Sequence, residues 1–134
     1  MKSFTISVVL CLFFVASAAW AQSAERPEPK FMAINFNKVK MTDMSALQKI
    51  WFEQAVPILN DLVREGKLVS YGLMEHAWGD EWNFNFFFVT KDHKAHLDFF
   101  DMYIERLRKK YPDTMGEYLS KIIEHKDNMY TLYQ

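Results

Sequence analysis

The stretch Trp82–Thr90 limits the possible folds more than any other part of the chain. It reads W-N-F-N-F-F-F-V-T, which combines strong β-propensity with a regular alternation between two faces. One face carries Phe84, Phe86 and Phe88. The other face carries Asn83, Asn85, Phe87 and Val89. The pattern predicts a strand in the middle of a sheet, with its phenylalanine ridge packed against helices.

A second stretch repeats the same pattern of phenylalanine and asparagine. Residues 31–40 begin F-M-A-I-N-F-N and predict a first strand. We expect its larger side chains, Met32, Ile34 and Phe36, to lie on the same face as the phenylalanine ridge. Asn35 and Asn37 would then join Asn83 and Asn85 on the opposite face.

The remaining elements alternate between helices and strands. In chain order they are a helix from about Ser45 to Gly66, a strand at Leu68–Trp78, a helix from Asp92 to Pro112, a helical stretch from Asp113 or Thr114, and a strand or helical end at residues 129–134. In the first helix, Ser45 and Gln48 match a capping box, although Thr42 or Asp43 could cap instead. Pro57 should kink this helix near Glu53, because proline removes a backbone donor.

The order β-α-β-β-α-(α)-β predicts a split β-α-β arrangement in an α+β fold. Such a chain forms a four-stranded antiparallel sheet with its helices on one face and the other face open. We expect one domain over residues 31–134.

This order resembles the dimeric α+β barrel (ferredoxin-like) superfamily, which includes antibiotic-biosynthesis monooxygenase-like and stress-responsive barrel domains. The segment Trp51–Leu73, W-F-E-Q-A-V-P-I-L-N-D-L-V-R-E-G-K-L-V-S-Y-G-L, is similar to the helix-Pro-helix-Gly-Lys-strand passage of small exported members whose role is unassigned. The resemblance implies a homodimer in which two open sheet faces meet as a barrel that holds a small ligand.

Residues 1–21 are predicted to be a signal peptide. Lys2 precedes a nearly continuous apolar run, and Ala19-Trp20-Ala21 fits an A-x-A cleavage site. The run is short for a membrane span, although an uncleaved anchor is the alternative. Residues 22–30 are polar with two prolines and predict an extended tether. We therefore expect a periplasmic or secreted protein.

Composition excludes several classes of function. Cys11 is the only cysteine and lies in the predicted signal, so the mature chain would have no thiol chemistry. The formal net charge is −1 for the full chain and −2 once the signal with Lys2 is cleaved, which gives no attraction to nucleic acid or to a membrane surface. The chain contains no Gly-rich phosphate loop, nucleophile elbow or H-E-x-x-H pattern, and we expect no cofactor.

The predicted ligand site lies on the open face of the sheet. A two-residue turn at Gly79-Asp80 would pair His76 with Asn83 and Met74 with Asn85, whereas a three-residue loop would turn His76 toward the helices. We favour the first arrangement. The candidate ligand-binding residues are then Asn35, Asn37, Met74, His76, Trp78, Asn83, Asn85 and Phe87. They predict an exported homodimer that binds a small, partly apolar or aromatic molecule.

Several alternatives stay open at this stage. The asparagines could bond each other and water across a dimer interface. The scaffold could serve a cofactor-independent oxygenase or a haem-modifying enzyme, with His76 as base or axial ligand, or a structural module that binds a partner. His93 and His96 share a helical turn and could hold a metal with Asp92 or His125, but a solvated, capped first turn explains them better, and we expect no metal site.

Overall fold

The computed structural model describes residues 28–76, 78, 79 and 81–133. The predicted signal peptide, residues 1–21, lies outside the described residues, as does the tether up to residue 27. No helix in the described part of the chain is both long enough and apolar enough to cross a membrane.

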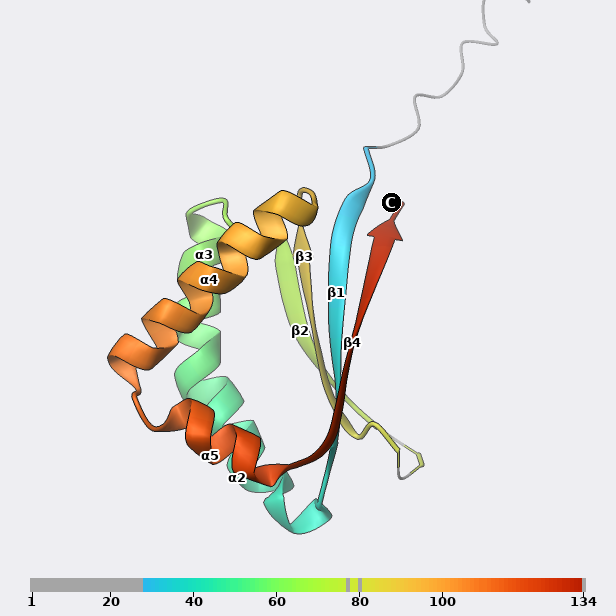
Figure 1. The fold of residues 1–134 in the computed structure, drawn as a ribbon, viewed down its shortest axis with the longest axis vertical. Coiled ribbons are helices and arrows are strands. Elements are labelled where there is room, and N and C mark those ends of the chain that lie inside the picture. Colours follow the sequence, from blue (N-terminus) through green and yellow to red (C-terminus); the bar gives the residue numbers. More distant parts are fainter. Residues whose placement is uncertain (1–27, 77, 80, 134) are drawn as a thin grey trace, which may run out of the picture.

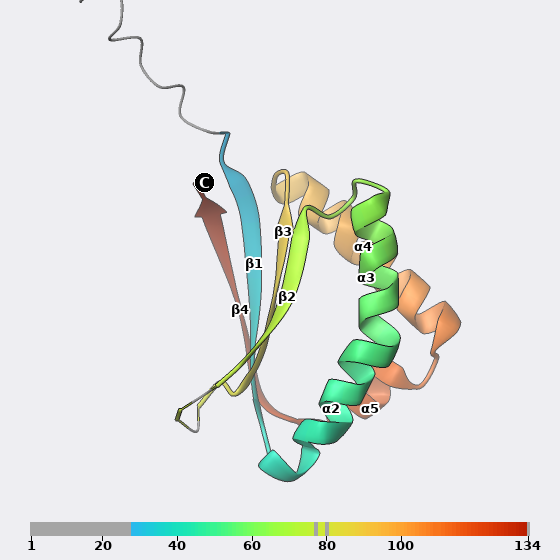
Figure 2. The same cartoon turned by 180° about the vertical axis from the view of Figure 1, so that it is seen from behind.

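Four strands form one sheet and the helices lie against one of its faces (Figure 1). The strands are β1 (Lys30–Val39), β2 (Ser70–Glu75), β3 (Phe84–Thr90) and β4 (Ile122–Leu132). The helices are α2 (Met44–Ile50), α3 (Val56–Arg64), α4 (His93–Lys110) and α5 (Thr114–Lys121), with a 3-10 turn η1 (Met41–Asp43) and a π-helix η2 (Trp51–Ala55). The strand order is β2-β3-β1-β4, and each neighbouring pair is antiparallel. Seen from behind, the second sheet face carries no helix (Figure 2). The predicted ferredoxin-like α+β fold is confirmed.

The register between β1 and β3 corrects the predicted faces of β1. Asn35 pairs with Phe86 and Asn37 with Phe84, so both asparagines lie on the helix-covered face. Met32, Ile34 and Phe36 of β1 lie instead on the open face. The physical reason is volume: the phenylalanines of β3 fill the space under the helices, and β1 meets them with smaller side chains. Ala33, for example, lies opposite Phe88 and is buried.

Asparagine side chains extend the β1–β3 pairing where the regular ladder ends. The Asn83 amide accepts from the Val39 backbone N–H at 2.9 Å and donates to the Val39 carbonyl at 3.0 Å. The Asn85 side chain accepts from the Asn37 N–H at 3.1 Å and donates to the carbonyl of Trp82. Trp82 has a φ of +24°, a strained value for a residue with a Cβ. Asn83 and Asn85 are buried here as replacements for backbone partners.

The register of β2 against β3 agrees with the favoured prediction. Met74 pairs with Asn85, and the His76 N–H donates to the Asn83 carbonyl at 3.4 Å. Gly72 lies opposite Phe87, whose ring covers it on the open face. A Cβ at Gly72 would come within 2.6 Å of that ring, so a larger residue here would force the Phe87 ring to move.

The helix departs from regular α-helical hydrogen bonding around Glu53, where the sequence predicts an effect of Pro57. The helix changes to π-helical hydrogen bonding over η2, and the Val56 N–H donates to the Trp51 carbonyl. The Glu53 carbonyl, which a residue with an N–H at position 57 would bond, accepts from the Tyr111 hydroxyl at 3.4 Å. Gly66, with a φ of +69°, ends the helix as predicted.

The predicted ends of the other helices and strands agree with the structure only in part. Neither the capping box nor an Asp43 side-chain cap forms at α2, and Gln48 donates instead to Glu75 at 2.8 Å. Asp92 caps α4 by accepting from the Ala95 N–H at 2.8 Å, as expected. The last strand begins earlier than the predicted residues 129–134, since β4 begins at Ile122, directly after α5. Residues 124–127 are charged or polar, so the sequence pattern did not indicate a strand there. An edge strand such as β4 tolerates such residues.

Replacing Asn83 should destabilise the fold. Asn83→Ala removes both side-chain bonds to Val39 and leaves a buried backbone N–H and C=O without partners, at an expected cost of about 1–3 kcal/mol. Urea denaturation followed by circular dichroism measures the free energy of unfolding. Asn60→Ala is the matched control, because exposed Asn60 makes a single bond to Tyr71, and it should cost less than about 0.5 kcal/mol. Equal losses in the two variants would contradict the backbone-replacement role.

Candidate functional site

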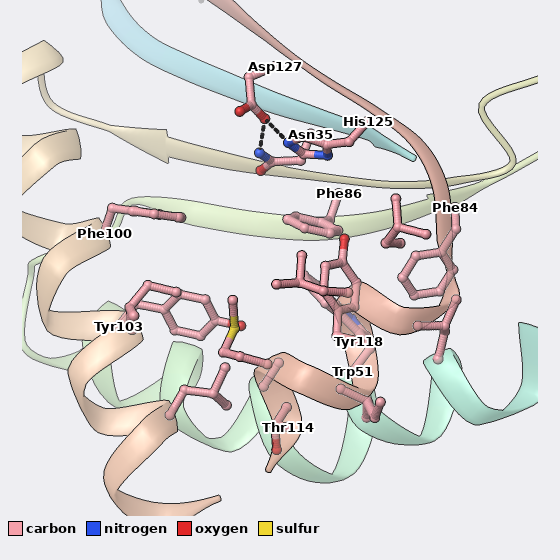
Figure 3. Close-up of a pocket in the computed structure, with 18 residues that line it drawn as sticks. Asn35, Trp51, Phe84, Phe86, Phe100, Tyr103, Thr114, Tyr118, His125 and Asp127 are labelled. Atoms are coloured by element: carbon pink, nitrogen blue, oxygen red, sulfur yellow. Dashed lines mark hydrogen bonds and ion pairs between the residues drawn. The ribbon is translucent and has the colours of Figure 1, made fainter. Parts of the chain in front are cut away.

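A cavity of about 240 Å³ lies between the helices and the sheet (Figure 3). Its lining residues come from β1, β3, β4 and the helical segments, and they are Asn35, Leu47, Ile50, Trp51, Ala55, Phe84, Phe86, Phe100, Tyr103, Ile104, Leu107, Thr114, Met115, Tyr118, Leu119, Ile122, His125 and Asp127. Phe100 and Leu119 are exposed as well as lining, so the cavity reaches the surface beside α4 and α5. This volume is slightly below the roughly 300–1,000 Å³ usual for drug-sized ligands, so the cavity suits a smaller organic molecule.

Rigid aromatic rings form much of the cavity wall. Trp51 stacks on Phe86 with ring centroids 5.2 Å apart, and Trp51 is 5% exposed. The π-helix that begins at Trp51 places this ring and Ala55 on the cavity side. The turn between α4 and α5 is tied to the same helix by two bonds, from Tyr111 to the Glu53 carbonyl and from Thr114 to Gln54. These bonds hold α5 across one end of the cavity.

Three polar side chains form one part of the wall next to the sheet. Asn35 on β1 donates through Nδ2 to Asp127 Oδ1 on β4. His125 Nε2 lies 3.2 Å from the same carboxylate oxygen, and His125 Nδ1 lies 2.7 Å from Asn37 Oδ1. Asn37 donates its own amide hydrogens to the Phe84 and Asn35 carbonyls, so its Oδ1 is an acceptor. The three side chains are therefore linked in one polar group at the cavity wall.

Two polar atoms of the lining residues are buried without a hydrogen-bond partner. These are Asn35 Oδ1 and the Tyr118 hydroxyl. Figure 3 shows the Tyr118 hydroxyl directed from α5 toward the sheet. Burial raises the pKa of Tyr118, and Tyr103 and Asp127 raise it further, so the hydroxyl keeps its proton at neutral pH. Burial also raises the pKa of Tyr103, and the cavity therefore holds neutral phenols.

His96 lies outside the cavity lining but is buried in the same aromatic layer. Its ring lies 5.2 Å from that of Phe31 and 6.2 Å from that of Phe100, and its Nδ1 is buried without a partner. Burial lowers the pKa of His96, His93 lowers it further, and Asp127 opposes this shift. Among the described residues, no group of three or more His, Cys, Asp or Glu side chains is placed to hold a metal ion.

The structure does not bring the eight predicted site residues together. Asn35 alone of the eight lines the cavity. Asn37, Asn83 and Asn85 are buried and bond the backbone, as described above. The other four lie on the open face or on the β2–β3 hairpin, and they are Met74, His76, Trp78 and Phe87. Trp78 is 92% exposed.

Sequence reasoning missed most of the residues that do line the cavity. The predicted last element, at residues 129–134, begins after His125 and Asp127, and the alternation of these two residues in β4 is the signal that could have identified them. A register shift between Lys38 and Val39 brings Ile122 to the same side as His125, although the two are three residues apart. Tyr118 falls in the helical stretch predicted from Asp113 or Thr114 and is not among the predicted site residues.

No protein-family model matches the chain, and no curated protein matches its sequence. Solved structures do match its fold. A NIPSNAP family protein of unknown function from Agrobacterium tumefaciens strain C58 is similar with a TM-score of 0.63 and 12% identity, over 81% of this chain and 92% of that one. A dimeric ferredoxin-like protein from an uncultured marine organism gives a TM-score of 0.61 and 15% identity, over 80% and 98%. SnoaB, a cofactor-independent oxygenase from Streptomyces nogalater, gives 0.53 and 12%, over 80% and 95%.

These similarities define the class of fold. The chain is a ferredoxin-like α+β protein with the architecture of the NIPSNAP and dimeric ferredoxin-like structures. At such low identity the shared property is the fold, and the function has to be argued from the site.

The lowered pKa of His96 predicts a pH-dependent stability. Below its ordinary value of 6.5, the unfolded chain binds a proton that the folded chain resists, so the free energy of unfolding should fall as the pH falls. His96→Phe keeps the ring contacts and removes this effect. Denaturation at pH 7.5 and pH 5.5 should show a smaller loss for His96→Phe than for the wild type. The exposed His76→Ala should behave as the wild type, and equal losses in all three would contradict the prediction.

Proposed function

We propose that this protein is an exported homodimer that binds a small, largely apolar molecule inside each subunit, in the cavity between the sheet and the helices. The observation that carries the proposal is an apolar cavity into which buried polar atoms project without partners. Leaving such atoms unpaired costs about 1–3 kcal/mol each, and a ligand that bonds them recovers this energy. The scaffold also occurs in an oxygenase, SnoaB, whose fold resembles this one.

The proposed site differs in place from the one expected from the sequence. A site between two sheet faces would use residues of the open face, but the asparagines expected there bond the backbone or lie under the helices. The cavity inside the subunit instead combines aromatic walls with a small number of polar groups, which is the usual composition of a small-molecule site.

Dimerisation is supported by the apolar side chains of the open face. Met32, Ile34, Phe36 and Phe87 lie there half-buried, with no helix above them. A largely apolar sheet face of this kind is usually covered by another layer. Two solved structures with this fold are described as dimeric. We propose that a second copy covers the open face.

A second candidate function is cofactor-independent oxygenation. It is favoured by the His125–Asp127 pair at the cavity wall, which could accept a proton from a bound substrate, and by the fold similarity to SnoaB. Oxygen uptake that begins when a bound ligand is added, and that His125→Ala abolishes, would identify this activity.

Filling the cavity should prevent binding. Ala55 is buried in η2 and lines the cavity, so Ala55→Met places a longer side chain inside it. We expect wild-type protein to increase the fluorescence of N-phenyl-1-naphthylamine, a neutral apolar probe, and Ala55→Met to bind it at least tenfold more weakly. Ala46→Met is the matched control, because Ala46 on α2 is half-buried and lies outside the cavity lining. Probe binding that Ala55→Met leaves unchanged would place the site elsewhere.

Native mass spectrometry tests export and assembly together. The protein, expressed with its leader and recovered outside the cytoplasm, should have the mass of two chains that each begin at Gln22. Ile34→Glu places a charge on the open face and should give a monomer that still binds the probe. Leu97→Glu, an exposed position on α4, should stay dimeric. A wild-type monomer, or a dimer that Ile34→Glu leaves intact, would contradict an interface on the open face.

A further inference from the structure

The orientation of the Asn35 amide decides what the cavity offers to a ligand. The Asp127 carboxylate only accepts hydrogen bonds, so Asn35 must present its NH₂ group to it. The carbonyl oxygen of the amide is then left on the cavity side, buried and without a donor. This position therefore requires an O–H or N–H donor from whatever fills the cavity.

The Tyr118 hydroxyl needs the opposite partner, a hydrogen-bond acceptor. Burial keeps it protonated, so it is an available donor, and it has no acceptor within reach. It points from α5 toward the sheet, while Asn35 lies in the sheet above it (Figure 3). The two groups face the same cavity from opposite layers. Asn35 Oδ1 needs a hydrogen-bond donor and the Tyr118 hydroxyl needs an acceptor. A hydroxyl group on the ligand can be both.

The charges around the cavity disfavour an ionised ligand. Asp127 is already paired with His125 at 3.2 Å and bonded by Asn35. No lysine or arginine is among the lining residues of the described chain. The neighbouring Lys126 lies instead 4.3 Å from the ring of Trp82, outside the lining. An anion would therefore meet the Asp127 carboxylate without a free cation to offset it.

We infer that the ligand is an uncharged, mainly apolar molecule with a hydroxyl group, which donates to Asn35 Oδ1 and accepts from the Tyr118 hydroxyl. The remaining walls, formed by Trp51, Phe86 and Phe100, suit a ring system or a short chain attached to that hydroxyl. This inference rests on the proposed function, since it names the chemistry of the molecule that occupies the same cavity.

A series of naphthalenes tests the inference on the wild-type protein. The probes are naphthalene, 2-naphthol, 2-methoxynaphthalene and 2-naphthoate, with affinity measured by displacement of N-phenyl-1-naphthylamine. The hydroxyl of 2-naphthol can donate and accept, the ether oxygen can only accept, and naphthoate adds a charge. We expect 2-naphthol to bind about tenfold more tightly than 2-methoxynaphthalene, 2-methoxynaphthalene to bind more tightly than naphthalene, and 2-naphthoate to bind weakest.

Two variants assign the hydrogen bonds to their residues. Asn35→Leu should weaken 2-naphthol about tenfold and leave 2-methoxynaphthalene and naphthalene nearly unchanged. Tyr118→Phe should weaken 2-naphthol and 2-methoxynaphthalene together, because both accept from the hydroxyl, and should leave naphthalene unchanged. Unchanged naphthalene binding shows in each case that the cavity is still formed. Tyr130→Phe is the matched control for Tyr118→Phe, since Tyr130 is exposed and outside the cavity lining.

The outcomes separate this inference from the proposed function. If none of the probes binds, the proposed function fails. If naphthalene, 2-naphthol and 2-methoxynaphthalene bind equally well to the wild type, the cavity is a binding site but the hydroxyl inference is wrong, and water satisfies the two polar atoms. If 2-naphthoate binds most tightly, the ligand is an anion and the charge argument is overturned. The wild-type series decides among these results even if Asn35→Leu does not fold.

Discussion

The pairing of β1 with β3 is the constraint on which the rest of the structure depends. It places Asn35 and Asn37 under the helices, opposite Phe86 and Phe84, and turns the bulky residues of β1 to the open face. A shift of this register by one residue would turn the asparagines of β1 to the open face and its bulky residues toward the helices. The helix-covered layer would then hold aromatic or aliphatic residues from both strands, and β1 would supply no polar group to the cavity. The buried asparagine bonds to Val39, Asn37 and Phe84 fix this register at the end of the ladder.

The cavity exists because two rigid parts of the fold keep it open. The π-helix at Trp51–Ala55 stacks an indole ring on Phe86, and the α4–α5 turn is bonded to the same segment through Tyr111 and Thr114. Pro57 connects the two features, because the proline frees the Glu53 carbonyl that the Tyr111 hydroxyl bonds. Packed interiors close most voids, and one of about 240 Å³ indicates walls that cannot collapse onto each other.

The polar groups of this cavity are few and come from distant parts of the chain. Asn35, Tyr118, His125 and Asp127 lie on β1, α5 and β4, and β4 brings the last two beside β1. This arrangement gives a neutral, mostly apolar site with one acceptor and one donor. Proteins with the same fold include an oxygenase and a protein of unknown function, so the groups in the cavity, more than the fold, define the chemistry.

The sequence alone determined the order of elements, the fold class, the β2–β3 register, the break in regular α-helical bonding before Pro57 and the cap at Asp92. Each depends on neighbours in the chain or on a short turn, where local chemistry decides the outcome. The tertiary structure alone decided the faces of β1, the length of β4 and the position of the cavity. The N-F-N pattern fits either face, because alternation fixes which residues share a side but leaves open which side meets the helices. That choice depends on how much volume the phenylalanines of β3 already fill, and Asn35 reaches the cavity as a result.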